Sequence, residues 1–236
     1  MKIVVLTGSG VSAESGLTTF RGQNGLWDNY PVEDVASIEG WYRNPRLVLD
    51  FYNKGRKKVQ NVEPNEAHKL IAELEKYHEV CVITQNVDNL HERAGSRNII
   101  HLHGEITKVR PQNTYTADDG YSEKYVKDIG YGEIFLGDKE NNSQLRPHIV
   151  WFGEAVPNIE KAIQQVSYAD VLLIVGTSMQ VYPAAGLYHY ASSQCRIYVI
   201  DPEEVPLSHD LRVTVIKDVA TRGMRKFFDE VCPKEV

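Results

Sequence analysis

Four short apolar runs constrain most strongly what this chain can fold into. They are Ile3–Leu6, Val80–Ile83, Val171–Val175 and Ile197–Ile200, and each is nearly continuous in apolar side chains. Such runs are typical of parallel strands that are buried on both faces of a sheet. A weaker run at Arg212–Ile216 is a candidate fifth strand.

Helical patterns lie between these runs. Glu66–Lys76 repeats apolar residues at the spacing of one helix face, and Ile159–Val166 and Thr221–Val231 are similar candidates. Strands that alternate with helices form a parallel sheet covered on both faces. We therefore predict an α/β fold built on a Rossmann-like parallel sheet.

The first strand leads into Gly8-Ser9-Gly10-Val11-Ser12-Ala13, which has the G-x-G-x-x-A spacing of a dinucleotide-binding turn. An ordinary unit continues with a helix and a second strand. Here the chain continues with Phe20-Arg21-Gly22 and then Trp27, and no strand follows. The glycine turn alone is weak evidence for a nucleotide site, because a tight turn with a purely structural role has the same sequence.

Two segments break the alternation of strands and helices. Residues 25–64 contain a predicted helix at Pro45–Val59, with Asn44 as its cap. Residues 104–149 are polar and irregular, and so long a stretch is usually functional or a lobe of its own. We predict that 25–64 and 104–149 form one small inserted lobe. The remaining residues form the predicted Rossmann-like domain: 1–24, 65–103 and 150–236.

Composition excludes several classes of protein. The formal net charge of −6 gives no basic footprint for nucleic acid. No apolar window is long enough for a membrane span, and no basic and apolar leader precedes the first strand, so we expect a cytoplasmic protein. The three cysteines (Cys81, Cys195 and Cys232) lie far apart, which argues against a disulfide framework or a zinc ribbon.

Polar residues follow two of the predicted strands, where a binding crevice opens in such folds. In TQNVDNLH (84–91), Gln85, Asn86 and Asp88 exceed what a single helix cap needs, although turn chemistry is the bland alternative. The GTS sequence at 176–178 supplies small and hydroxyl residues that suit a phosphate or a ribose.

Each of two further motifs is compatible with more than one role. HLHGE (101–105) places His101 and His103 on one face of an extended segment. A general base is a better use of this pair than a metal site, because no third ligand has a recognisable spacing. RPHIVWFGE (146–154) is either a core strand or an edge that pairs with an extended peptide.

Together these motifs resemble the sirtuin family of NAD-dependent protein lysine deacylases, from residue 4 to about residue 220. The motif sequences AESG and TFR are similar to those of the class that includes bacterial enzymes and members that remove succinyl or malonyl groups. The matching blocks, in chain order, are GSGVSAESGLTTFRGQNGLW, TQNVDNLH, HLHGE, RPHIVWFGE, and GTS followed by VYPAAG.

The resemblance implies roles for individual residues and a small-molecule partner, NAD. His103 and Asn86 would be catalytic. The implied cofactor-binding residues are Gly8, Ser9, Gly10, Ala13, Glu14, Phe20, Arg21, Trp27, Gln85, Asn86, Asp88, Gly176, Thr177, Ser178 and Asp201. The implied substrate-binding residues are Tyr52, Arg56, Val150, Trp151, Phe152, Gly153 and Glu154, with the strip from Val150 clamping the substrate as an added strand.

The resemblance also implies a mechanism. The acyl-lysine oxygen would attack the nicotinamide ribose and nicotinamide would leave. His103 would then take a proton from a ribose hydroxyl, and the products would be free lysine and O-acyl-ADP-ribose. The partner would be an acylated protein or peptide, with no nucleic acid and no membrane. The oligomeric state is not determined, although a monomer is favoured.

Three departures from the family pattern matter. Residues 104–149 contain no cysteine where most members carry four for zinc, so we predict no metal. The lobe would instead depend on an aromatic mini-core. Its expected members are Tyr115, Tyr121, Tyr125, Tyr131 and Phe135. The adenosine-binding asparagine of the family is Asp201 here, which can accept but not donate a hydrogen bond.

The third departure concerns the acyl group. Members that bind acidic acyl groups use a tyrosine and an arginine three residues later. Here Tyr52 is followed by Gly55 at that position, and Arg56 comes one residue later, rotated by about 100° on a helix. Two roles of Arg56 are equally expected: a ligand for the acyl carboxylate, or a solvated charge on the helix surface. Desuccinylation and demalonylation are therefore left open beside deacetylation.

Two other functions remain as alternatives. A protein mono-ADP-ribosyltransferase shares the first chemical step, and a remodelled lobe would suit a dedicated partner. A non-catalytic NAD-binding module would be expected to lack Asn86, Asp88 or His103, and all three are present.

Overall fold

The protein is described here by a computed structural model. Its described residues are 1–19, 30–113, 115–116, 120–121, 123–207 and 212–232. Phe20, Arg21 and Trp27, which we expect at the cofactor, lie outside these ranges. Within the described ranges, no helix combines the length and apolar character that crossing a bilayer requires.

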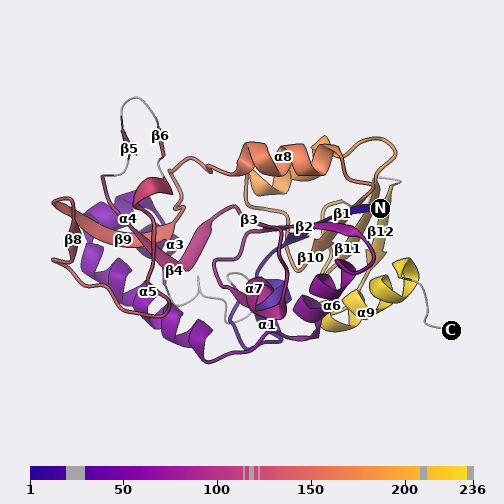
Figure 1. Ribbon diagram of the computed structural model, residues 1–236, viewed down its shortest axis with the longest axis horizontal. Coiled ribbons are helices and arrows are strands. Elements are labelled where there is room, and N and C mark those ends of the chain that lie inside the picture. Colours follow the sequence, from indigo (N-terminus) through magenta and orange to yellow (C-terminus); the bar gives the residue numbers. More distant parts are fainter. Residues whose placement is uncertain (20–29, 114, 117–119, 122, 208–211, 233–236) are drawn as a thin grey trace.

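Six parallel strands form the larger sheet, in the order β12-β11-β10-β1-β2-β3 (Figure 1). Their bounds are Lys2–Thr7 (β1), Glu79–Thr84 (β2), Ile99–His101 (β3), Val171–Val175 (β10), Arg196–Ile200 (β11) and Val213–Ile216 (β12). The predicted α/β fold is confirmed, and all five apolar runs form strands. β3 was not predicted, because three residues are too few to show a periodicity.

Helices cover both faces of this sheet. α6 (Glu66–Leu74) and α9 (Ala220–Val231) pack on one face, whereas α8 (Ile159–Ser167) and the 3-10 helix η2 (Ala184–Tyr190) pack on the other (Figure 1). Alternate residues of β1 join the two cores: Ile3 and Val5 face α6 and α9, and Val4 and Leu6 face α8. Because both faces are covered, the strands read as continuous apolar runs.

A second, antiparallel sheet lies at the other end of the molecule, beside a group of helices (Figure 1). Its strands are β4 (Gly104–Pro111), β7 (Lys127–Asp128), β8 (Lys139–Glu140) and β9 (Ser143–Ile149). The helices are α3 (Val32–Val35), α4 (Ile38–Arg43) and α5 (Pro45–Gln60). Short elements complete the chain: α1 (Gly10–Ala13), α7 (Leu90–Ala94), β5 (Tyr115–Thr116), β6 (Gly120–Tyr121) and the 3-10 helix η1 (Glu123–Tyr125).

α5 forms as its sequence predicts. The Asn44 side chain accepts a hydrogen bond from the amide of Leu47 at 3.1 Å, and Pro45 occupies the first turn, where no amide donor is needed. The buried face of the helix carries Val48, Leu49 and Tyr52 into the core of the antiparallel part. The helix therefore packs as an amphipathic element against β4 and β9.

The expected aromatic mini-core is wrong for Phe135, which is 54% exposed. Tyr131 packs at the edge of the core and hydrogen-bonds Asn89. The core itself comes from α4, α5 and the two long strands, because their longer elements can bury more apolar surface than a polar loop. Its buried members are Trp41, Val48, Leu49, Tyr52, Val59, Ile106, Val109, Ile134, Ile149 and Trp151.

A buried ion pair stands beside this core. The guanidinium of Arg146, which is fully buried, donates to both carboxylate oxygens of Glu154, at 2.7 and 2.9 Å. Its central carbon lies 3.4 Å from the ring centroid of Trp151, and Arg110 reaches the same carboxylate at 3.4 Å. The cluster thereby ties the segment after β9 to the antiparallel sheet through charge-assisted bonds.

We expect Arg146→Gln to destabilise the protein strongly, because it leaves the Glu154 carboxylate buried with its main partner removed. Removing one member of a buried pair costs about 3–5 kcal/mol, and the melting temperature should fall by roughly 10 °C. Thermal unfolding followed by circular dichroism measures the change. Arg225→Gln, which breaks the exposed pairs with Glu66 and Asp229, is the matched control. Equal, small shifts in both variants would contradict a structural role for the Arg146 pair.

Candidate active site

The carboxyl ends of three neighbouring strands meet at one edge of the parallel sheet. Thr7 at the end of β1 pairs with Val175 of β10 and with Thr84 of β2. The loops that follow are joined by backbone hydrogen bonds: the amide of Gly10 donates to the carbonyl of Gly176 at 2.9 Å, and the amide of Gln85 donates to the carbonyl of Thr7 at 2.9 Å. The three polar motifs thus converge as parallel strands require.

Glycines allow the first and third of these loops to touch backbone to backbone. A Cβ atom at Gly8 would lie 2.7 Å from the carbonyl oxygen of Gly176, and a Cβ atom at Gly176 would lie 2.4 Å from the amide nitrogen of Val11. Gly176 also has a φ of +60°, which favours glycine. Side chains are thereby excluded where a pyrophosphate could approach the backbone.

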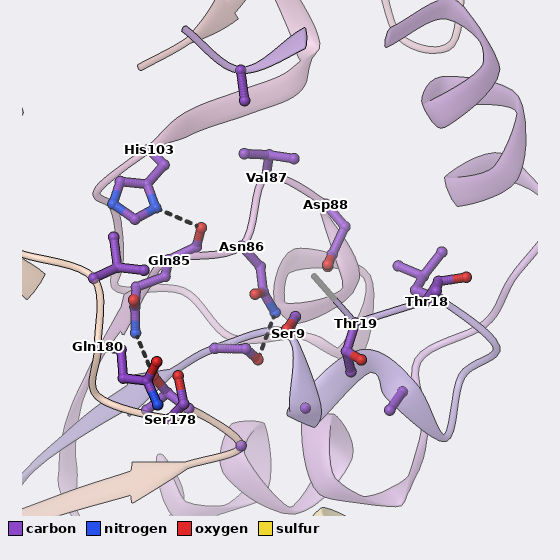
Figure 2. A pocket seen from close by; sticks show the side chains of 18 of the residues that line it. Ser9, Thr18, Thr19, Gln85, Asn86, Val87, Asp88, His103, Ser178 and Gln180 are labelled. Carbon is purple, nitrogen blue, oxygen red and sulfur yellow. Dashed lines mark hydrogen bonds between the residues drawn. The ribbon is translucent and has the colours of Figure 1, made fainter. Parts of the chain in front are cut away.

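Asn86 and Asp88 are buried and joined through Ser12 of α1. The Asn86 amide nitrogen donates to the carbonyl of Gly8 at 3.1 Å and to the Ser12 hydroxyl at 3.2 Å. Ser12 in turn donates to a carboxylate oxygen of Asp88 at 3.1 Å. Burial raises the pKa of Asp88, opposed by the bonds from the Leu90 amide and Ser12. Figure 2 shows Asn86 and Asp88 beside Ser9 on one side of the pocket.

The oxygen of the Asn86 side chain is buried and has no hydrogen-bond partner among the described residues. A buried acceptor without a partner costs free energy, so such an atom in a pocket points to a ligand that supplies a donor. The side chain is held by two bonds through its nitrogen, which leaves its oxygen available.

His103 follows β3 and precedes β4, and its ring lines the same pocket (Figure 2). Its Nδ1 lies 3.0 Å from the carbonyl oxygen of Gln85, which can only accept, so Nδ1 carries the hydrogen. The neutral ring therefore keeps a lone pair on Nε2. Burial lowers the pKa of His103, opposed by the Gln85 bond, and this favours the neutral form.

The expected residues share one cavity of about 820 Å³. Its walls include Gly8, Ser9, Gly10, Ala13, Glu14, Tyr52, Gln85, Asn86, Asp88, His103, Val150, Trp151, Phe152, Gly153, Glu154, Gly176, Thr177, Ser178 and Asp201. Glu14 uses both carboxylate oxygens to accept from Thr221, which fastens α9 at the rim. Burial raises the pKa of Asp201, opposed by a hydrogen bond from the amide of Glu203.

Arg56 is corrected in both of its expected roles. Its side chain is fully buried and is neither a solvated charge nor a part of the cavity wall. Its Nε donates to the carbonyl of Ile106 at 2.7 Å and another nitrogen donates to the side chain of Asn53 at 2.8 Å. Burial lowers the pKa of Arg56 to about 10. Because Arg56 lies one residue further along α5 than the expected position, its guanidinium points into the core of the lobe.

The strip from Val150 to Phe152 also differs from the expected free strand edge. The amide of Val150 donates to the carbonyl of His103, that of Trp151 donates to Glu154, and that of Phe152 donates to the carbonyl of Ala36. With these donors in use, the three residues cannot add a strand through their amides in this conformation. The Phe152 side chain is 47% exposed, and Phe152 lines the cavity together with Val150 and Trp151.

Several cavity residues carry little signal in the sequence. Thr18, Thr19 and Gln180 line the wall together with the expected set (Figure 2). Ser12 joins Asn86 to Asp88, although in the sequence it is only one position of a glycine turn. These residues come close to the cavity because of the conformations of their loops, and sequence patterns of a few residues do not predict such conformations.

The structure places two carboxylates near His101, although the sequence spacing showed no third potential metal ligand there. Potential ligand atoms of Glu92, His101 and Glu105 lie within 4.8 Å of one another. The group is already matched in charge: Glu92 approaches the His101 ring at 2.7 Å, and Glu105 pairs with Lys108 at 2.6 Å. These contacts account for the group without a metal ion.

Comparison with known proteins agrees with this geometry. A model of the Sir2 family matches residues 8–183. An NAD-dependent protein deacylase of Bacteroides thetaiotaomicron is 51% identical over 98% of both chains, and one of Helicobacter pylori is 48% identical over 94% of both chains.

Solved structures give the same result. A Sir2 homologue in complex with NAD has a TM-score of 0.85 at 39% identity, covering 98% of this chain and 89% of that chain. A Sir2 structure with a p53 peptide and NAD⁺ has a TM-score of 0.77 at 28% identity, covering 97% of this chain and 92% of that chain. Since the family model spans most of the chain and the relatives align over nearly its whole length, this chain belongs to the Sir2 family.

Proposed function

We propose that this chain is an NAD-dependent protein deacylase acting on acylated lysine side chains. Its curated relatives carry the name NAD-dependent protein deacylase, and solved relatives contain NAD and a peptide. The observation that carries the proposal is His103, a neutral histidine with an accepting nitrogen in the cavity that also holds the glycine loops and Phe152.

The residues present fit NAD. The loops at Gly8 and Gly176 leave no room for a Cβ atom, so that main-chain groups rather than side chains form this part of the wall. The buried oxygen of Asn86 needs a donor, which a ribose hydroxyl or a carboxamide supplies. Gly8, Gly10 and Gly176 would hold the phosphates, and Asn86 and Asp88 would hold the nicotinamide end.

NAD, when bound, supplies an electrophilic ribose carbon, nicotinamide as leaving group and ribose hydroxyls that receive the acyl group. His103 is the general base of this proposal: Nε2 accepts a proton from a hydroxyl while the Gln85 carbonyl holds the tautomer through Nδ1. Ser12 keeps Asn86 and Asp88 in place.

The acyl-lysine chain would enter beside Phe152, whose exposed ring offers an apolar contact at the mouth of the cavity. Tyr52 forms the inner wall, and its hydroxyl accepts a hydrogen bond from Nε1 of Trp151 at 2.9 Å. Burial raises the pKa of Tyr52, which keeps the phenol neutral. A wall formed by the Phe152 ring and a neutral phenol suits a neutral acyl group.

We infer a preference for acetyl over succinyl groups. Arg56, which lies one residue beyond the expected position, is bound within the lobe core. Lys54 and Lys58 line the cavity, but an ammonium cannot grip a carboxylate with the two parallel bonds of a guanidinium. Acidic acyl groups therefore meet a weaker partner here.

Three further features belong to the proposal. We infer that the lobe binds no zinc, since residues 104–149 contain no cysteine. We keep the division into a Rossmann-like domain and a lobe of residues 25–64 and 104–149, supported by two separate sheets. We also propose a cytoplasmic location, supported by three cysteines that are free and buried.

We expect His103→Ala to lower kcat by about 10²- to 10⁴-fold on an acetyl-lysine peptide, because the general base is lost. Mass spectrometry follows the peptide and the cofactor products. His189→Ala, at an exposed histidine away from the cavity, should retain activity. Transfer of ADP-ribose to protein without loss of the acyl group would overturn deacylation and favour the transferase alternative.

The acyl preference has its own test. Acetyl-lysine peptides should be turned over faster than succinyl-lysine peptides, and Arg56→Gln should leave the ratio of the two kcat/KM values unchanged while lowering the melting temperature. The reason is that Arg56 bonds to Ile106 and Asn53 instead of to substrate. A selective loss of the succinyl activity in Arg56→Gln would show that this guanidinium reaches the acyl group.

Metal analysis tests the zinc-free lobe. Protein purified without chelator should contain well under one zinc per chain, because the described lobe holds no thiolate ligand. Chelator treatment should leave the melting temperature unchanged. A chelator would lower the melting temperature only if the fold depended on bound zinc. About one zinc per chain, or a chelator-induced drop in melting temperature, would sink this expectation.

A further inference from the structure

His101 and His103 bind two consecutive carbonyl groups of the loop after β2. Nδ1 of His103 lies 3.0 Å from the carbonyl oxygen of Gln85, and Nδ1 of His101 lies 3.2 Å from the carbonyl oxygen of Asn86. Between them, the amide of Leu102 donates to the carbonyl of Thr84 at 2.9 Å. The segment 101–103 therefore holds the backbone from which the Asn86 side chain projects.

The two histidines differ at the second ring nitrogen. Nε2 of His101 lies 2.7 Å from a carboxylate oxygen of Glu92, and the side chain of His101 is 9% exposed. A backbone carbonyl and an ionised carboxylate can only accept hydrogen bonds. Both contacts of His101 exist together only when both ring nitrogens carry hydrogen, so this ring is an imidazolium, whereas His103 has one such partner.

Glu92 belongs to α7, the helix that follows the loop. The first turn of α7 is held by Asp88, whose carboxylate accepts from the amide of Leu90 at 3.1 Å. His101 thus links the loop backbone at Asn86 to the helix that begins two residues after Asp88. The backbone of His101 is itself held, because Asn158 donates to its carbonyl at 3.0 Å.

We propose that His101, as an imidazolium between Glu92 and the carbonyl of Asn86, is a positioning residue for the loop that carries Asn86 and Asp88. It acts through that loop and does not touch the substrate. The inference rests on the proposed deacylase function of the cavity. Loss of the ring proton on Nε2 would set two acceptors against each other and release the loop from α7.

Other charged groups face His101 from the elements around it. Glu105 and Lys108 of β4 pair with each other at 2.6 Å, and Glu105 adds to the favourable field. Asp88 also interacts with the ring, and His91 of α7 and His148 of β9 respond to its charge as well. Burial lowers the pKa of both of these histidines, so they are neutral and add no competing cation.

The direction of the pH dependence follows from these contacts. Burial alone lowers the pKa of His101, but the hydrogen bond and charge of Glu92, together with Glu105 and the Asn86 carbonyl, outweigh it and raise that pKa above its ordinary value. A group with a raised pKa contributes its bond below that pKa and loses it as the pH rises. Loop positioning should therefore fail on the alkaline side, whereas the general base His103 limits activity on the acid side.

Activity profiles test the proposal. The pH dependence of kcat/KM for NAD is measured on an acetyl-lysine peptide for the wild type, Glu92→Gln and Glu73→Gln. Glutamine keeps the shape of Glu92 but removes the charge, so the alkaline limb should move to lower pH by about one unit. Glu73, whose side chain pairs with Lys76 at the surface, undergoes the same change as a control and should give the wild-type profile.

A second readout does not depend on activity. Nitrogen NMR of the imidazole rings in ¹⁵N-histidine-labelled protein reports how many ring nitrogens are protonated, with His101 assigned from a His101→Gln variant. We expect His101 to be doubly protonated at a pH where His103 is neutral. A neutral His101 in the wild type would overturn the proposal, whatever the stability of the variants.

The outcomes separate this inference from the proposed function. An active wild type whose alkaline limb does not move in Glu92→Gln overturns the role of His101 and leaves the deacylase intact. A wild type that does not deacylate overturns the proposed function, and the positioning role with it. A shifted limb together with a doubly protonated ring supports both.

Discussion

The pairing of β1 with β10 on one side and β2 on the other is the constraint on which the site depends. Thr7 is opposite both Val175 and Thr84, so three strands end at the same level of the sheet. The loops that follow must then share one edge, and the bond from the Gly10 amide to the Gly176 carbonyl closes two of them together. Ser12, Asn86 and the two glycine loops meet because the backbone register requires it.

The antiparallel part is stabilised in a different way. Its core includes two guanidinium groups that are fully buried, Arg56 and Arg146. Two nitrogens of each donate to hydrogen-bond acceptors, whereas Nη2 of Arg56 and Nε of Arg146 have no partner among the described residues. Arg146 also stacks on Trp151 at the point where the chain returns to the cavity. Buried charges need such partners to be tolerated, so these networks set the position of the wall at Trp151 and Glu154 as well as the stability of the lobe.

A single histidine pair shows how close neighbours in sequence can receive different chemistry. His103 has one accepting partner and stays neutral, whereas His101 lies between two acceptors and carries a proton on each nitrogen. The elements β2, α7 and β3 come together only in the folded chain. Their packing, rather than residue type, divides the roles of base and support between the two rings.

Local patterns were enough for most of the architecture. The five apolar runs became strands and the helices at Pro45, Glu66, Ile159 and Ala220 began within one residue of their predicted starts, because periodicity and capping act over a few neighbours. The predicted site residues that the structure describes also line the cavity, except for Arg56. Phe135 was misassigned to a core, since composition does not say which aromatic ring faces solvent.

The sequence by itself therefore determined the five apolar strands of the parallel sheet and the helices between them, the glycine turn and the set of polar residues at strand ends, all of which depend on local chemistry. Only the tertiary structure decided the burial of Arg56, the amide partners of the strip from Val150 and the contact of His101 with Glu92. Each of these depends on the angle of a side chain about its element and on atoms brought from another element. A rotation of about 100° per helical residue is enough to move a guanidinium from a cavity to a core.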